Sequence, residues 1–211
     1  MSGLLFVIAP EADHKIINQL LLYIRDWEYG ALDSFRLVNT KNAYDLEGFA
    51  DGDRTIALEA TAPPVPVDFE NAWAGASLKD VEDYCLDLDR GDFEDGGKAH
   101  LFVVVDSQGV QDKTCIIGER MMDYENEPIT FPERFKKLRL PWDETYLTWC
   151  NLNIANMNFE EFTEEADVEY EDTLTRQWWT YHSVGNGPEL SKENRRRRDA
   201  EIAELREDSR A

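Results

Sequence analysis

Three short apolar runs constrain the fold of this chain more than any other feature of its sequence. They are Leu4–Ala9, Leu101–Val105 and Lys113–Gly118, and the second of them, LFVVV, is the strongest. Apolar runs of this length, rich in β-branched residues, are typical of strands that are covered on both faces of a sheet. We therefore predict a sheet with Leu101–Val105 at its centre. Gly109 marks the connection to the next strand.

Two stretches show the spacing of three to four residues between apolar side chains that is typical of amphipathic helices. The first is Ala12–Trp27, and Gly30 is expected to end it. The second is Asp68–Leu88. Within it, Ser77 and Asp80 resemble a capping box, so we expect two helices to meet at that point.

Shorter signals predict the remaining elements. Phe35–Leu37 and Thr55–Ala60 alternate apolar and polar residues, which indicates two strands, and Asn39–Arg54 between them is expected to be a loop. The β-branched and aromatic content of Thr145–Cys150 predicts a further strand. Phe131–Leu138 is expected to form a short helical turn.

Asn158 and Glu161 have the spacing of a capping box for a helix over Phe159–Ala166. Together these elements predict one α/β domain at residues 1–188, built on a single mixed sheet with packed helices. A charged C-terminal tail, helical or disordered, is expected at residues 189–211.

The charge of the chain excludes several functions. Its 211 residues include 44 Asp and Glu against 22 Lys and Arg, a net charge of −22. This balance opposes stable binding to nucleic acid and to anionic membrane surfaces. Residues 191–211 are nearly neutral, so the acidity belongs to residues 1–190. We interpret the one basic run, Arg195–Arg198, as part of a mixed-charge helix rather than a nuclear-localisation or nucleic-acid patch, because acidic residues follow it directly.

The first ten residues, MSGLLFVIAP, lack the basic leader and the long apolar stretch of a secretory signal. Their apolar run is also much shorter than the ~20 residues that cross a bilayer. Cys85, Cys115 and Cys150 are widely spaced and odd in number, which favours reduced thiols over disulfides. We therefore expect a cytoplasmic protein that spans no membrane, with the nucleus as the alternative compartment.

Common catalytic motifs are absent. The sequence contains no GxSxG, GxGxxG or GxxxxGK[ST], and its three histidines are isolated, so we expect no cofactor and no metal. Whether the chain is an enzyme stays open. Asp106 directly follows the central strand, where open α/β sheets place ligand-binding carboxylates. An aspartate at this position also starts turns well.

The densest aromatic group in the sequence is Trp178, Trp179 and Tyr181. Because Trp and Tyr dominate interface hot spots, these residues are candidates for partner binding. The alternative, which we favour, is a C-terminal strand or arm that folds over the core.

The most distinctive string is NLNIANMNFEEF at Asn151–Phe162. It resembles the C-terminal signature of an uncharacterised domain family of bacteria and fungi, and Asp68–Trp73 and the LFVVVD strand are similar to that family as well. The likeness covers about residues 55–168 and implies no function. The same string fits a structural corner, because Asn side chains bond nearby backbone. The alternative is a ligand site at which Asn151 and Asn156 present their amides.

Two hypotheses follow for the function. The leading one is a non-catalytic interaction module for a basic protein partner, since the chain is acidic, has an aromatic cluster and lacks catalytic motifs. The alternative is a small-molecule-binding protein or enzyme with its site near Asp106 and the 151–158 corner. That alternative requires Asp106, Asn151 and Asn156 to lie together.

Overall fold

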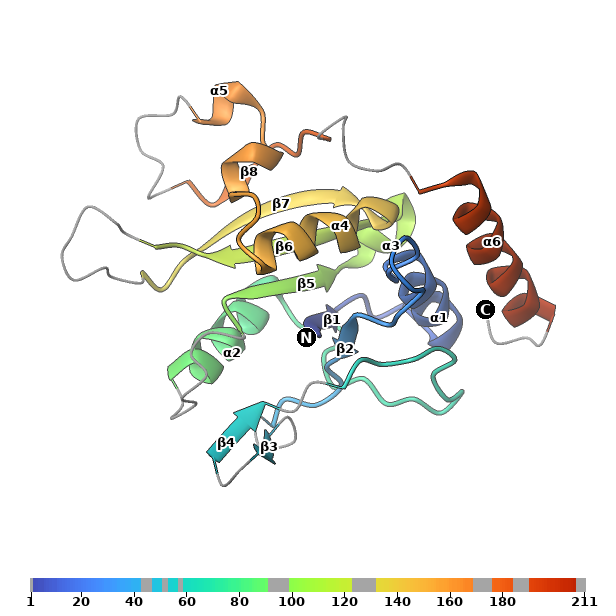
Figure 1. Ribbon diagram of the computed structural model, residues 1–211. Coiled ribbons are helices and arrows are strands. Elements are labelled where there is room, and N and C mark those ends of the chain that lie inside the picture. Colours follow the sequence, from blue (N-terminus) through green and yellow to red (C-terminus); the bar gives the residue numbers. More distant parts are fainter. Residues whose placement is uncertain are drawn as a thin grey trace.

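A six-stranded mixed sheet forms the centre of the protein (Figure 1). The computed structural model describes residues 2–42, 47–50, 53–56, 59–90, 99–122, 132–168, 176–183 and 190–207. In spatial order the strands are β2 (Phe35–Leu37), β1 (Gly3–Val7), β5 (Leu101–Val105), β6 (Thr114–Arg120), β7 (Phe135–Pro141) and β8 (Trp178–Trp179). The first three run parallel, β6 is antiparallel to both its neighbours, and β8 is parallel to β7. The predicted α/β domain with a mixed sheet is therefore confirmed.

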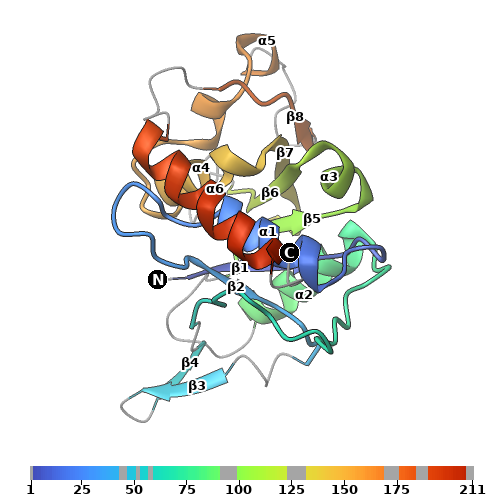
Figure 2. The ribbon, with the colours of Figure 1, turned by 90° about the vertical axis from the view of Figure 1, so that its right-hand side faces the viewer.

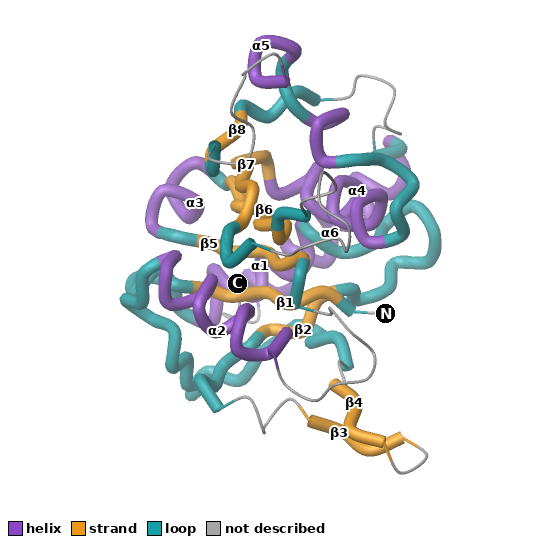
Figure 3. Tube along the Cα trace, turned by 90° about the vertical axis from the view of Figure 1, so that its left-hand side faces the viewer, coloured by secondary structure: helices purple, strands orange, loops and turns teal. Residues whose placement is uncertain are grey.

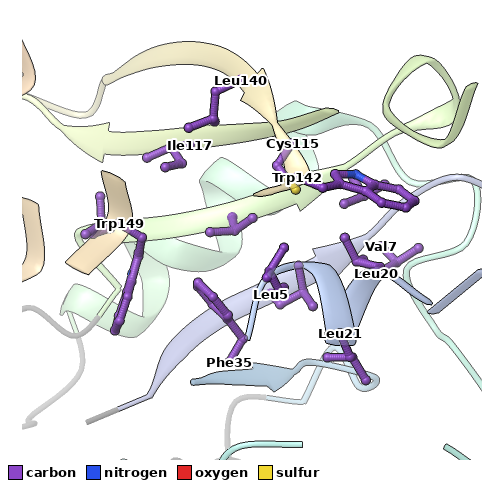
Figure 4. Packing of buried hydrophobic residues seen from close by; sticks show 14 of the residues in the cluster. Leu5, Val7, Leu20, Leu21, Phe35, Cys115, Ile117, Leu140, Trp142 and Trp149 are labelled. Atoms are coloured by element: carbon purple, nitrogen blue, oxygen red, sulfur yellow. The ribbon is translucent and has the colours of Figure 1, made fainter. Parts of the chain in front are cut away.

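Helices cover both faces of this sheet. On one face, side chains such as Leu5 and Ile117 pack against α1 (His14–Tyr23) and α4 (Trp142–Asn153), and Figure 4 shows part of this core. On the other face, Phe6 and Phe102 pack against α2 (Leu78–Arg90). Figures 2 and 3 show α4 and α2 on opposite sides of the strands. This double cover explains why β1 and β5 are continuous apolar runs: every residue of both strands is buried.

Side chains cap the starts of α1 and α2. Asp13 caps α1, and its carboxylate accepts bonds from the amides of Lys15 and Ile16, both at 3.0 Å. The predicted box at the start of α2 is confirmed: the Asp80 carboxylate accepts the Ser77 amide, and the Ser77 hydroxyl accepts the Asp80 amide. The separate helix expected before Ser77 is wrong. Residues 68–76 form turns instead, and Trp73 is still buried.

Two predictions on the C-terminal side of the sheet are also wrong. The stretch predicted as a strand, Thr145–Cys150, lies inside helix α4. The buried residues Trp142, Thr145, Trp149 and Leu152 recur at helical spacing, and this pattern outweighs the β propensity of the segment. The turn of helix expected at 131–138 is instead strand β7 from Phe135 onward, whose side chains alternate between the two faces.

Three smaller elements differ in their bounds. The loop expected at 39–54 contains strand β3 (Glu47–Ala50), which pairs with β4 (Asp53–Ile56) as a separate antiparallel hairpin. β4 overlaps the predicted 55–60 strand at Thr55 and Ile56, and residues 57 and 58 lie outside the described residues. Gly109 lies in a short helix, α3 (Ser107–Asp112), that connects β5 to β6. The helix predicted at 159–166 divides into a 3₁₀ turn, η2 (Phe159–Phe162), and α5 (Glu165–Val168), and the Asn158–Glu161 capping box is present.

The charged tail is helical. α6 (Lys192–Glu207) lies beside α1, as Figures 1 and 2 show. Its Ile202 and Leu205 pack with Leu22 and Trp27 of the body. The guanidinium of Arg198 lies 4.4 Å from the ring centroid of Tyr23, so part of the basic run is used in docking the tail.

Candidate partner-binding surface

Asp106 stands at the carboxyl end of β5 and has a structural role. Its carboxylate caps α3 by accepting the Gly109 amide at 2.7 Å. It also accepts two bonds from the guanidinium of Arg139 on β7, at 3.0 and 2.6 Å. Partial burial by itself raises the pKa of Asp106, but the bonds from Arg139 and Gly109 outweigh this effect and hold the pKa below its usual value. These bonds account for the carboxylate without a ligand.

The two asparagines of the candidate ligand site lie together, but away from Asp106. Asn151 accepts a bond from the side-chain amide of Asn156 at 2.7 Å and donates to the carbonyl of Leu147 at 2.9 Å. Both belong to the turn that ends α4. Asp106 lies near the other end of that helix, where the indole of Trp142 bonds the Thr114 carbonyl. Nine residues of helix separate the two ends by about 14 Å. The structure therefore does not bring the three residues into one site.

The aromatic group divides into buried and exposed members. Trp179 is buried against the ring of Phe159, at 6.1 Å between centroids. The hydroxyl of Tyr181 donates to Glu144 on α4 at 2.6 Å, and burial, followed by this bond, raises the pKa of Tyr181. These two residues behave as an arm folded over the core. Trp178 points to the opposite face of β8, because successive side chains of a strand alternate.

Trp178 is exposed, and its ring lies beside a buried cation. It is 47% exposed, and the ring centroid lies 5.8 Å from the ammonium of Lys137, its register partner on β7. The side chain of Lys137 is only 3% exposed. Its ammonium forms an ion pair with Glu82 on α2 and bonds the side-chain oxygen of Gln177 at 3.2 Å. Lys137 thus joins α2 to the strand that carries Trp178.

Exposed carboxylates lie on α2, the helix whose Glu82 pairs with Lys137. Asp80, Asp83 and Asp87 are exposed on α2, and their successive spacings of three and four residues place them in one stripe. The bond from Lys79 to Asp83 raises the pKa of Lys79, and the charges of Asp83, Glu82 and Glu133 add to the rise. We call Trp178 together with the exposed carboxylates of Asp83 and Glu133 the Trp178 surface, and the buried Lys137–Glu82 pair links its strand to α2.

No protein-family model, curated protein or solved structure matches the chain, so the family resemblance over about residues 55–168 stays a prediction. Within the described ranges, no group of three or more His, Cys, Asp or Glu residues is arranged to hold a metal ion. No helix in the described part of the chain combines the length and the apolar character needed to cross a bilayer.

Sequence reasoning found Trp178 but missed the residues that surround it. Lys137 was not singled out because residues 131–138 were expected to be helical. The available signal was the alternation in FKKLRLP at Phe135–Pro141, which has the two-residue period of a strand. No local sequence pattern indicates that Glu82 pairs with Lys137, because the two residues are 55 positions apart.

Proposed function

We propose that the protein is an acidic binding module for a basic segment of another protein, and that Trp178 is its central contact residue. The observation that carries this proposal is the exposed indole of Trp178, held on a strand of the central sheet in a chain of net charge −22. Exposed Trp side chains are enriched among the residues that dominate binding energy. The face of an indole ring also attracts Lys and Arg side chains.

The position of Trp178 suits a contact residue because its surroundings fix it. Trp179, the next residue, is anchored in the core against Phe159, which holds β8 in place. The ammonium of Lys137, which lies beside the indole ring, is paired with the carboxylate of Glu82. No uncompensated charge therefore lies next to the ring. A contact residue that is already ordered loses little conformational entropy when a partner binds.

Charge decides what kind of partner this surface fits. The exposed carboxylates of Asp83 and Glu133 suit Arg or Lys side chains at the rim of a contact. The net charge of −22 also steers cationic partners toward the protein. The same charge repels a second copy of this chain, so we assign the surface to a basic partner rather than to self-association.

The test measures binding of a fluorescein-labelled octaarginine peptide to the full chain by fluorescence anisotropy. At about 0.15 M salt, long-range attraction is screened beyond about 8 Å, so short-range contacts dominate the differences between variants. We expect Trp178→Ala to weaken binding by roughly fivefold, the effect of about 1 kcal/mol from a lost cation–π contact.

Tyr29→Ala is the matched control, because Tyr29 is an exposed aromatic residue, 73% exposed, on the loop after α1. It should bind the peptide as the unaltered chain does. Equal affinity of the Trp178→Ala and Tyr29→Ala proteins would contradict the assignment of Trp178. The alternative of a small-molecule site shared by Asp106 and the 151–158 corner has less support, since the two places lie at opposite ends of α4. The cytoplasmic location stays a prediction.

A further inference from the structure

A half-buried carboxyl lies next to an ion pair on the α4 face of the sheet. Glu119 on β6 is the register partner of Lys136 on β7. The ammonium of Lys136 forms an ion pair with Glu160 of η2, 5.6 Å from the ring centroid of Phe159. Among the residues that the structure describes, none forms a hydrogen bond or an ion pair with the Glu119 carboxyl. One ammonium therefore faces two carboxyl groups, and only Glu160 is bonded to it.

We propose that Glu119, Lys136 and Glu160 form a proton-dependent clamp between the sheet and η2. When Glu119 is protonated, Lys136 forms an ion pair with Glu160 alone, and this ion pair holds η2 on the sheet. With Glu119 ionised, two carboxylates compete for one ammonium. Directly opposed residues on antiparallel strands have Cβ atoms about 5 Å apart, so Lys136 can turn to Glu119 without a backbone change. The bond to η2 is then weakened.

The surroundings of Glu119 place this change near neutral pH. Burial raises its pKa to about 7; the charge of Lys136 opposes the rise, and that of Glu160 adds to it. Leu101 on β5, the other register partner of Glu119, is apolar. Lys136 and Glu160 are thus the charged groups that act on Glu119, and both belong to the clamp.

The test follows Glu119 and η2 separately in the full chain. Carbon-13 NMR of the side-chain carboxyl measures the titration of Glu119. Hydrogen exchange, expressed as protection factors, measures opening at the amides of Thr163 and His182, which bond carbonyls of η2. We expect Glu119 to titrate near pH 7. Protection at both amides should fall roughly two- to fivefold as pH rises through that range, which is the usual strength of a partly exposed ion pair.

Two variants and one control decide the outcome. Glu119→Gln should remove the pH dependence of protection and keep the clamp closed. Glu160→Gln should lower protection at every pH and lower the midpoint of Glu119, because one of the charges that raises it is gone. Glu164→Gln, an exposed carboxyl nearby, should behave as the unaltered chain. In the unaltered chain, titration of Glu119 at its ordinary pKa of 4.5, or protection that does not change with pH, overturns the proposal. Both measurements can be made even if the Glu119→Gln variant fails to fold.

Discussion

The carboxylate of Asp106 receives both guanidinium bonds of Arg139, at 3.0 and 2.6 Å, while it caps the helix that follows its strand. One side chain therefore connects the end of β5, the start of α3 and the end of β7. This position at the carboxyl end of the central strand is where an α/β sheet most often binds ligands. In this protein the position is occupied by a structural contact.

Replacing Asp106 separates its two roles. Asn keeps a good capping oxygen but loses the ion pair, which is partly exposed, so Asp106→Asn should cost about 1 kcal/mol of unfolding free energy. Asp106→Ala removes the cap as well and should cost about 2 kcal/mol. Urea denaturation measures both values. An alanine variant as stable as the unaltered chain would show that these bonds contribute nothing.

The ion pair between Lys137 and Glu82 is buried, with side chains 3% and 13% exposed. Removing one partner leaves the other charge uncompensated, so Lys137→Met and Glu82→Leu should each cost about 3 kcal/mol. The double variant should lie within about 1 kcal/mol of the unaltered chain, because an apolar pair replaces the buried charges.

The Lys79–Asp83 pair on the same helix is the control for that cycle. Its side chains are 69% and 54% exposed, so Lys79→Met should have an effect below about 0.5 kcal/mol. If the two single losses at Lys137 and Glu82 simply add in the double variant, the pair is not coupled as the structure indicates.

Stability should depend on pH through Glu119. Its pKa in the folded protein is raised to about 7 from an ordinary value of 4.5, so the folded state keeps a proton that the unfolded state releases. The stabilisation is complete below about pH 4.5 and is lost as pH rises through about 7, for a total of about 3 kcal/mol. The difference in unfolding free energy between the unaltered chain and Glu119→Gln, measured across this range, isolates the effect. A difference that is constant with pH would refute it.

The cysteines should differ in reactivity. Cys85 and Cys115 are fully buried, and burial raises the pKa of Cys115 to about 12, whereas Cys150 is partly exposed. Thiolate is the reactive form of a thiol. Iodoacetamide at about pH 8 should therefore modify Cys150 alone in the folded protein and all three cysteines in urea, as read by mass spectrometry. Early modification of Cys115 would mean that its core position is wrong.

The sequence predicts the centre of this fold because its apolar runs leave few alternatives. The five apolar side chains of Leu101–Val105 are removed from water only if helices pack on both faces of the strand. α1 packs on one face of the sheet and α2 on the other. Local signals fail where tertiary packing decides. The TYLTWC segment has strand propensity, but its buried positions recur at helical spacing along α4.

The candidate surface was predicted only in part, for a similar reason. Trp178 and Trp179 look equivalent in sequence, and strand alternation sends one outward and the other into the core. The neighbours of Trp178 come from β7 and α2, far away in the chain, so no local pattern could identify them. Likewise, Asn151 follows a predicted strand in the sequence, as Asp106 does, but in the structure Asn151 belongs to a helix.

Nitrogen-15 NMR of the indole N–H groups, recorded during titration with octaarginine, tests whether Trp178 contacts the basic partner. Trp178→Phe identifies the signal of Trp178 by its loss. We predict that this signal moves saturably with peptide, while the signal of buried Trp73 stays in place. A Trp178 signal that does not move when the peptide binds, or that moves no more than that of Trp73, would contradict the account.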